Sequence, residues 1–383
     1  MSPNLPSRLP DVGTTIFTVM SRLAAEHGAI NLSQGFPDFA PPALLTERVA
    51  HHMAAGANQY APMAGTPVLR EAIAAKVERL YGARYDVEHE VTVTAGATQA
   101  IFTAIAACVH PGDEVIVFAP VYDSYGPSVV LAGGRVIEAH LRHPDYRPDW
   151  AEVRGLIGPK TRMIVINTPH NPTATVWSAR DMAELAALVR GSDIVVVAGE
   201  AYEHMVFDGG RPESVIRHAE LRERSFVISS FGKTYHCTGW KIAYCVAPRA
   251  LMAEFRKAHQ FVVFTVHHPS QLAIADFMNA RPDFADDLSA FYQQKRDYFR
   301  QQLAGSRFRP LPSAGTYFQL AMIDGINDMA DTDFCRWLTT EHGVAAIPVS
   351  AFSADRRDDR VVRFCFAKNE GTLAAAGERL RRV

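Results

Sequence analysis

The sequence predicts an α/β fold in which a mostly parallel sheet of seven strands forms a large lobe and a smaller α+β lobe follows it. Strand-like apolar runs alternate with helical patterns through the middle of the chain, which is typical of a parallel sheet covered by helices. After about residue 281 this alternation gives way to a long helical stretch and a mixture of short strands and helices. With 383 residues, of which 48% are hydrophobic and 21% charged, the chain has the composition of a globular protein with an extensive core.

The predicted elements follow one another in a regular order. The seven strands are the runs EVTVTAG, EVIVFAP, RVIEAHL, RMIVINTP, DIVVVAG, SFVISS and IAYCVAP. Helices are indicated between them by apolar residues at helical spacing and by caps: one lies between Thr66 and Gly82, another covers about residues 97–109, and Ser178 caps a third. In the smaller lobe we expect helices over about 282–303 and 331–342, and strands in GTYFQLAMI, VAAIPV and RVVRFCFA.

Charge and cysteine content exclude several classes of protein. The formal net charge is −2, so no electrostatic argument favours binding to nucleic acid or to an anionic membrane surface. The five cysteines are odd in number and widely spaced, which fits neither a disulfide framework nor a metal site. The N-terminal segment has no signal-peptide pattern, and no run is long and apolar enough to span a bilayer. We therefore expect a cytoplasmic protein without a metal.

One lysine carries the strongest functional signal. Lys233 lies in the run SSFGKTYHCTGWK, directly after a predicted strand. A lysine among small and aromatic groups with a second cation nearby, here Lys241, has a lowered ammonium pKa and can form a Schiff base with an aldehyde. Ser230 and Lys241 suit a phosphate close to that aldehyde. The run therefore indicates a site for pyridoxal 5'-phosphate; the alternative is a solvated lysine on a loop.

Two further motifs fit the phosphate and the ring of such a cofactor. TAGATQA places Gly96, Ala97 and Thr98 where a strand gives way to a helix, and the free amides of a helix start form an anion site. FAPVYDSYG places Tyr122 just past a strand end, where a flat aromatic side chain can stack on the ring. Taken singly, each motif also fits an ordinary turn or a core tyrosine.

Three residues fit the remaining polar groups. Asn171 follows a strand and starts an Asn-Pro turn, so its amide can donate to the phenolic oxygen of the cofactor, and Tyr202 can hydrogen-bond the same oxygen. Arg363 lies between apolar neighbours in a predicted strand, where an unpaired arginine is rare. A bidentate interaction with a substrate carboxylate would pair it, and a buried salt bridge to Asp or Glu is the alternative.

The ordered motifs resemble the class I/II aminotransferases of pyridoxal phosphate fold type I, above all the branch with methionine and kynurenine/glutamine aminotransferases. The resemblance covers nearly the whole chain and rests on GFPDFAPP, NQYAPMAGTPVLREAI, TAGATQAIF, NTPHNPTATVW, AYEHMVFDG, SSFGKTYHCTGWKIAYCVAP and RFCFAKNEGTL. It implies a large cofactor-binding domain over residues 43–281 and a discontinuous small domain formed by 1–42 and 282–383.

The resemblance also implies roles for single residues. Lys233 would be the Schiff-base lysine, while Ala97, Thr98, Ser230 and Lys241 would hold the phosphate and Tyr122 would stack on the ring. Asn171 and Tyr202 would bind the phenolic oxygen, and Arg363 would bind the substrate α-carboxylate, with Gly35 nearby. Tyr60 resembles the tyrosine that reaches the phosphate across a subunit interface, which implies a homodimer with two shared sites.

The function implied is the transfer of the α-amino group of an apolar or aromatic amino acid, such as methionine, phenylalanine, tyrosine, kynurenine or a glutamine-like substrate, to a 2-oxo acid. Lys233 would act as general base and then as general acid. The side-chain pocket would draw on the aromatic residues Phe17, Phe36, Phe264, Tyr317 and Phe352. The alternatives are a cysteine-conjugate β-lyase and a cofactor-binding protein of low catalytic activity.

One position departs from the family. The aspartate that pairs with the pyridine nitrogen in relatives is replaced by Gly199 in the run VVAGEAYEH. Loss of such a partner weakens the ring as an electron acceptor and can reduce the rate by orders of magnitude. Three interpretations remain open: the adjacent Glu200 substitutes, the ring works unprotonated, or the chain is a weakened transaminase.

Overall fold

The structure, a computed structural model, describes residues 5–383 of the protein. A seven-stranded sheet forms the centre of its large lobe. β8 is antiparallel to both of its neighbours and the other adjacent pairs are parallel, which confirms the predicted mostly parallel sheet. In spatial order the strands are β2 (Val91–Thr94), β8 (Ala243–Val246), β7 (Ser225–Ser230), β6 (Val195–Gly199), β5 (Thr161–Asn167), β3 (Glu114–Ala119) and β4 (Arg135–His140).

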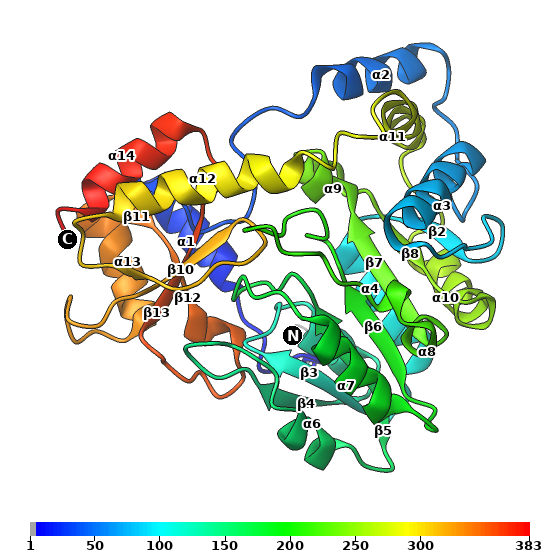
Figure 1. Cartoon of the computed structure of the whole chain (residues 1–383), viewed down its shortest axis with the longest axis horizontal. Coiled ribbons are helices and arrows are strands. Elements are labelled where there is room, and N and C mark those ends of the chain that lie inside the picture. The colour runs from blue at the N-terminus through cyan, green and yellow to red at the C-terminus, as the bar shows by residue number, and fades with distance from the viewer. Residues whose placement is uncertain (1–4) are drawn as a thin grey trace.

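Helices cover both faces of this sheet, because successive residues of each buried strand point to opposite sides. On β5, Ile164 and Ile166 join one apolar cluster, whereas Met163 and Val165 join another. The result is three layers, with the sheet between two sets of helices (Figure 1). The first cluster takes in α3 (Pro67–Tyr81), α6 (Trp150–Leu156), α7 (Ala179–Val189), α8 (Ala219–Arg222) and α11 (His268–Ala280), and the second takes in α4 (Ala97–Cys108), α5 (Tyr125–Leu131) and α10 (Arg249–Val262).

The helix ends predicted in the large lobe are confirmed. Thr66 precedes the first residue of α3, and Gly82 ends it with a left-handed φ of 72°. α7 starts after Ser178, whose hydroxyl accepts the N–H of Asp181 in a reciprocal capping box. Gly82 and Ser178 act through local backbone freedom and hydrogen bonding, whereas the Thr66 hydroxyl makes no capping hydrogen bond.

The smaller lobe contains a four-stranded antiparallel sheet in the order β12-β13-β10-β9 and a parallel pair, β1 with β11. The pair joins the N-terminal arm to the C-terminal region, near the helices drawn on the left of Figure 1. The 282–303 helix was predicted too long, because residues 282–287 form turns, and VAAIPV divides between the two sheets. The elements are β1 (Ile30–Asn31), β9 (Arg309–Pro310), β10 (Phe318–Met322), β11 (Val344–Ala345), β12 (Ile347–Pro348), β13 (Val361–Cys365), α1 (Ile16–Glu26), α12 (Leu288–Leu303), α13 (Asp331–His342) and α14 (Glu370–Leu380).

The domain limits at residues 42/43 and 281/282 stay a prediction, and residues 1–4 of the expected small domain lie outside the described part. α2 (Ala43–Ala54) packs against α11, where Arg48 pairs with Asp276 at 2.6 Å. Among residues 5–383, no helix combines the length and the hydropathy needed to cross a membrane.

The strand directions decide where a site can form. The parallel strands β3, β5, β6 and β7 end at one edge of the sheet, where α/β proteins bind their ligands. β8 runs the other way, so its amino end lies at the same edge and brings Lys241, two residues before Ala243, to it. Thr94 at the end of β2 pairs with Ala243 and completes the edge.

Candidate active site

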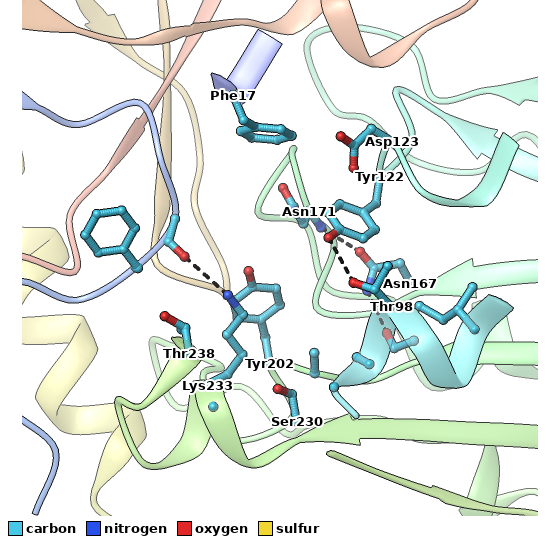
Figure 2. Close-up of a pocket in the computed structure, with 18 of the residues that line it drawn as sticks. Phe17, Thr98, Tyr122, Asp123, Asn167, Asn171, Tyr202, Ser230, Lys233 and Thr238 are labelled. Carbon is cyan, nitrogen blue, oxygen red and sulfur yellow. Dashed lines mark hydrogen bonds between the residues drawn. The ribbon is translucent and has the colours of Figure 1, made fainter. Parts of the chain in front are cut away.

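A cavity of about 520 Å³ opens at this edge of the sheet, between the two lobes (Figure 2). Strand ends, helix starts and the loop around Gln34 all contribute to its wall. Ten of the eleven residues predicted for the site line it: Gly35, Ala97, Thr98, Tyr122, Asn171, Tyr202, Ser230, Lys233, Lys241 and Arg363. These residues come from segments far apart in the sequence, so the fold brings together what the motifs suggested separately.

Lys233 lies on the short helix α9 (Phe231–Thr234), immediately after β7. The backbone passes close to the next loop here, because a Cβ on Gly232 would lie 3.0 Å from the Cα of Thr238. The Lys233 amine donates to the hydroxyl of Tyr317 at 2.7 Å and to the carbonyl of Gly35 at 3.2 Å. The Tyr317 hydroxyl in turn donates to the same carbonyl at 2.6 Å. The amine is therefore held in place by neutral oxygens.

Burial lowers the pKa of Lys233 from its ordinary 10.5 to about 8. The nearby charges of Arg363 and Lys241 lower it further, because like charges disfavour the ammonium form. This confirms the direction expected from the sequence. A neutral amine becomes accessible near physiological pH, as a nucleophile and a proton acceptor require.

The predicted phosphate-binding residues surround the start of α4. Gly96 precedes the helix with φ 82°, and a Cβ there would lie 3.0 Å from Cε and 3.1 Å from Nζ of Lys241. The cation can approach the helix N-terminus this closely because residue 96 has no side chain. Helix amides and a lysine ammonium at one point form an anion site, and Ser230 and Thr98 line the cavity beside it.

Asn171 lies beyond the end of β5 and is fixed on two sides. Its N–H donates to Oδ1 of Asn167 at 2.8 Å, and its own Oδ1 accepts Nη1 of Arg363 at 2.6 Å. The side-chain NH₂ of Asn171 is left to face the cavity. The Tyr122 hydroxyl contacts that of Thr98 at 3.4 Å, and the buried Tyr202 ring packs edge-on against Tyr317 at 5.1 Å.

Arg363 is 1% exposed and forms no salt bridge among the described residues, which argues against the alternative of a buried salt bridge to Asp or Glu. Nη1 donates to Asn171, Nη2 donates to the carbonyl of Ser33 at 3.1 Å, and the guanidinium lies 3.9 Å from the centre of the Phe318 ring. Nε is buried without a hydrogen-bond partner. Burial lowers the pKa of Arg363 to about 10. A buried cation without an acidic partner among the described residues is stabilised by an anion, and a substrate carboxylate in the cavity would supply one.

The aromatic residues suggested for the side-chain pocket separate into groups. Phe17 and Phe36 line the cavity, while Tyr317 bonds the lysine instead of facing a substrate. Phe352 packs edge-on against Phe17 at 5.7 Å, behind the wall. Phe264 is 41% exposed on the outer surface, so its placement in the pocket of this chain was wrong.

Tyr60 lies outside the cavity of its own chain. Its side chain is 78% exposed and packs edge-on against Phe264 at 5.1 Å. The adjacent His268 contacts the carbonyl of Gln59 at 3.1 Å, and the described residues contain no cluster of His, Cys, Asp and Glu that could hold a metal. The role of Tyr60 stays a prediction.

Gly199 ends β6 and lines the cavity, but Glu200 does not. The Glu200 carboxylate is 1% exposed and accepts the N–H of Val215 at 3.1 Å, on the other side of the strand. Burial raises its pKa to about 8. Of the three interpretations of Gly199, the structure therefore excludes substitution by Glu200.

Comparison with known proteins identifies the family. The model of the Aminotransferase class I and II family matches residues 27–380. The chain belongs to this family. It is 53% identical to the methionine aminotransferase of Escherichia coli over 383 residues, covering 100% of this chain and 99% of that protein. The crystal structure of an E. coli methionine aminotransferase superposes with a TM-score of 0.97 and full coverage of both chains. Kynurenine–oxoglutarate transaminase 1 of Homo sapiens is 32% identical, covering 98% of this chain and 97% of that protein.

The protein is thus an α/β aminotransferase of fold type I, as predicted, and acts on an amino acid and a 2-oxo acid. The family uses pyridoxal 5'-phosphate. The donor set fits that group: a buried lysine of lowered pKa, a cation at a helix N-terminus, and an arginine with an unused N–H. Sequence reasoning missed Tyr317 as the partner of Lys233, Asn167, which orients Asn171, and Phe318 beneath Arg363. No local pattern marks Tyr317 and Phe318, because they act across the two lobes, whereas Asn167 lies only four residues before Asn171 in the same motif and was open to detection there.

Proposed function

We propose that the enzyme transfers the α-amino group of an apolar or aromatic amino acid, with methionine the first candidate, to a 2-oxo acid. The observation that carries this proposal is Arg363, which is buried, has no acidic partner within salt-bridge distance among residues 5–383, and lies in one cavity with Lys233. The 53% identity to the methionine aminotransferase of E. coli supports the choice of substrate.

Each residue has a definite task in this proposal. Arg363 binds the substrate α-carboxylate, and Asn171 orients both the guanidinium and the phenolic oxygen of the cofactor. When bound, pyridoxal phosphate supplies an aldehyde that takes up the amino group and a ring that draws electrons from the α-carbon. The Lys233 amine, which is neutral when it does not hold the cofactor, would accept the α-proton of the substrate as general base and give it up again as general acid.

The remaining cofactor contacts follow from the same cavity. We assign Ala97, Thr98, Ser230 and Lys241 to the phosphate, because a helix start and an ammonium converge there. Tyr122 would stack on the ring, and Tyr202 would hydrogen-bond its phenolic oxygen. The carbonyl of Gly35 holds the Lys233 amine at 3.2 Å. A Cβ on Gly35 would lie 2.7 Å from Cζ of Phe318, so glycine is required for the loop to lie against that ring.

The side chain of the substrate would extend toward Phe17 and Phe36, which form an apolar part of the cavity wall. Phe17 is held against Phe352, so the rings present a fixed surface. Thioether and aromatic side chains pack well on such rings. No structural feature specifically favours β-elimination from cysteine conjugates.

The decisive experiment is a half-reaction with methionine. Enzyme reconstituted with pyridoxal phosphate should convert to the amine form of the cofactor and release the 2-oxo acid in a single turnover. Lys233→Ala should abolish this conversion, and borohydride followed by peptide mapping should label Lys233 in the parent protein. Thr234→Ser, which keeps the hydroxyl that donates to the carbonyl of Ser230 and removes only a methyl group beside Lys233, serves as the matched control. An unlabelled Lys233, or full turnover by Lys233→Ala, would refute the proposal.

We further propose a cytoplasmic homodimer in which Tyr60 completes the site of the partner. Tyr60 and Phe264 form an exposed aromatic pair, and nearby Phe261 is 90% exposed, an apolar surface that favours association. The hydroxyl of Thr265 donates to the carbonyl of Ala61 at 2.9 Å, which holds the two loops together.

Subunit exchange tests this arrangement. A dimer of one Lys233→Ala and one Tyr60→Phe protomer would contain one complete site, with the lysine of one chain and the tyrosine of the other. Mixing the two variants should restore activity at limiting cofactor above the sum of the separate proteins. No gain on mixing, with exchange verified by mass, would show that Tyr60 does not serve the neighbouring site.

A further inference from the structure

The cavity wall formed by Gly199 carries no charge. Among residues 5–383, the cavity is lined by a single carboxylate, that of Asp123. Figure 2 shows Asp123 close to Tyr122, on the side of the cavity where Phe17 lies. An acidic partner beside the ring nitrogen of pyridoxal phosphate keeps that nitrogen protonated. The structure offers no such partner beside Gly199.

A tyrosine hydroxyl occupies the space that a side chain at position 199 would need. A Cβ on Gly199 would lie 2.8 Å from the Tyr125 hydroxyl and 3.4 Å from Nδ2 of Asn167. Real Cβ atoms are essentially never found as close as 2.8 Å to another heavy atom. The residues at positions 199 and 125 therefore depend on each other, because the Tyr125 oxygen fits in its place only while residue 199 has no side chain.

Of these two polar neighbours, only Tyr125 has a side chain without a hydrogen bond to the described residues. Asn167 accepts the N–H of Asn171 at 2.8 Å and donates to the carbonyl of Gly199 at 2.6 Å. Tyr125 begins α5, is 3% exposed, and packs edge-on against Tyr122 at 5.8 Å. Within the described residues its hydroxyl makes no hydrogen bond, although it lines the cavity. The Tyr125 oxygen is not among the enclosed polar atoms without a partner, so the hydroxyl is open to the cavity and free to bond a ligand.

The chemistry of the cofactor indicates which atom would meet this wall. In the pyridoxal ring the aldehyde carbon and the nitrogen are para to each other. With the aldehyde at Lys233, the nitrogen faces the opposite wall. In Figure 2 the Lys233 amine and Asn167 lie on opposite sides of the labelled group, and Asn167 is hydrogen-bonded to Gly199.

We propose that the Tyr125 hydroxyl, in place of a carboxylate, is the hydrogen-bond partner of the pyridine nitrogen, an inference that rests on the proposed aminotransferase function. The hydroxyl is the donor and the ring nitrogen is the acceptor. Burial raises the pKa of Tyr125 above its ordinary value of 10, so the phenol keeps its proton and the nitrogen stays neutral.

A neutral ring draws electrons from the substrate less strongly than a protonated one. The enzyme would therefore remove the α-proton more slowly than relatives with a carboxylate at this place. Aspartate cannot simply be restored, because its Cβ would meet the Tyr125 oxygen. Removing that oxygen first should make room for the carboxylate.

The test uses holoenzyme carrying pyridoxal phosphate labelled with ¹⁵N in the ring, which reports protonation independently of turnover. The parent protein should show the chemical shift of a neutral, hydrogen-bonded nitrogen. Tyr125→Phe should shift the signal to that of a nitrogen without a donor and weaken cofactor binding about two- to tenfold, the range for one hydrogen bond. Tyr85→Phe is the matched control, because it removes the hydroxyl of another buried tyrosine, one that lies outside the cavity and has no hydrogen-bond partner among residues 5–383.

Two more variants test the coupling. Gly199→Asp combined with Tyr125→Phe should give a protonated nitrogen, whereas Gly199→Asp alone should bind the cofactor less well than the double variant. The two substitutions should thus be strongly non-additive, as expected for groups in direct contact. Additive effects would contradict the structural argument.

The outcomes separate this inference from the proposed function. A protonated nitrogen in the parent protein, or the same ¹⁵N shift in Tyr125→Phe, overturns the role of Tyr125 while leaving the lysine-bound cofactor and transamination intact. Failure of the labelled cofactor to attach to Lys233 overturns both.

Discussion

Replacing Arg363 with lysine tests the substrate-binding role most directly. The guanidinium donates through Nη1 to Asn171 and through Nη2 to Ser33, and Nε remains unused. Lysine keeps the positive charge but cannot offer a second parallel N–H to a carboxylate. A hydrogen bond to a charged group contributes about 1.5–3 kcal/mol, so kcat/KM for methionine should fall about 10- to 100-fold.

The assay compares two amines in single-turnover reactions with holoenzyme. Methionine carries the carboxylate that Arg363 is expected to bind, and 3-(methylthio)propylamine has the same side chain without it. Arg363→Lys should slow the reaction of methionine and leave that of the amine nearly unchanged. Arg300→Lys is the matched control: Arg300 also donates to a side-chain amide, of Gln319, and to a carbonyl, of Leu311, but lies outside the cavity. Equal losses for both amines would mean that Arg363 is structural.

Three other predictions concern the cavity. Gly96→Ala should weaken binding of pyridoxal phosphate about 10- to 100-fold, because the added Cβ displaces Lys241. Gly112→Ala is the control and should lower only the stability of the fold, because Gly112 has a similar φ of 91° and its added Cβ would have no described atom within 4 Å. Equal cofactor affinity in the two variants would contradict this prediction. In cofactor-free protein, the folded state binds fewer protons than the unfolded state between pH 8 and 10.5, because burial lowers the pKa of Lys233 to about 8. The unfolding free energy of the parent minus that of Lys233→Met should therefore rise with pH across this window in urea titrations, and a constant difference would refute the assigned pKa. Asp123→Asn should raise the kcat/KM ratio of glutamate to methionine about tenfold, because it removes the carboxylate that repels an acidic side chain, and an unchanged ratio would place the substrate side chain elsewhere.

Local signals predicted much of the fold correctly. The capping box of α7, the glycine that ends α3 and the seven strands in their order along the chain follow from hydrogen bonding, backbone freedom and periodicity within short segments. The 282–303 helix was predicted too long, because Pro282 also fits the first turn of a helix, whereas residues 282–287 form turns and α12 begins at Leu288. VAAIPV was predicted as one strand, but its two halves pair with different partners, β1 and β13. Pairing between distant segments cannot be inferred from the segments themselves.

In the candidate site too, contacts within a motif were predictable and contacts between distant segments were not. The motif around Lys233 predicted the direction of its pKa shift, because glycine, aromatic and cationic neighbours lie close in the chain. Its hydrogen-bond partner Tyr317 lies 84 residues away in the other lobe and was assigned to a substrate pocket. Glu200 was a candidate to replace the missing aspartate, but successive side chains point to opposite sides of a strand, and its carboxylate lies beside Val215 on the other side.

The sequence by itself determined the family, the chemistry and the residue types of this enzyme, because lysine, glycine and arginine in these motifs have few other uses. Only the tertiary structure decided which groups meet. The absence of a side chain at Gly199 is visible in the sequence, but the presence of the Tyr125 oxygen in that space follows from packing between α5 and β6. This contact joins segments 74 residues apart, so it forms only when the chain folds, and local sequence patterns do not predict it.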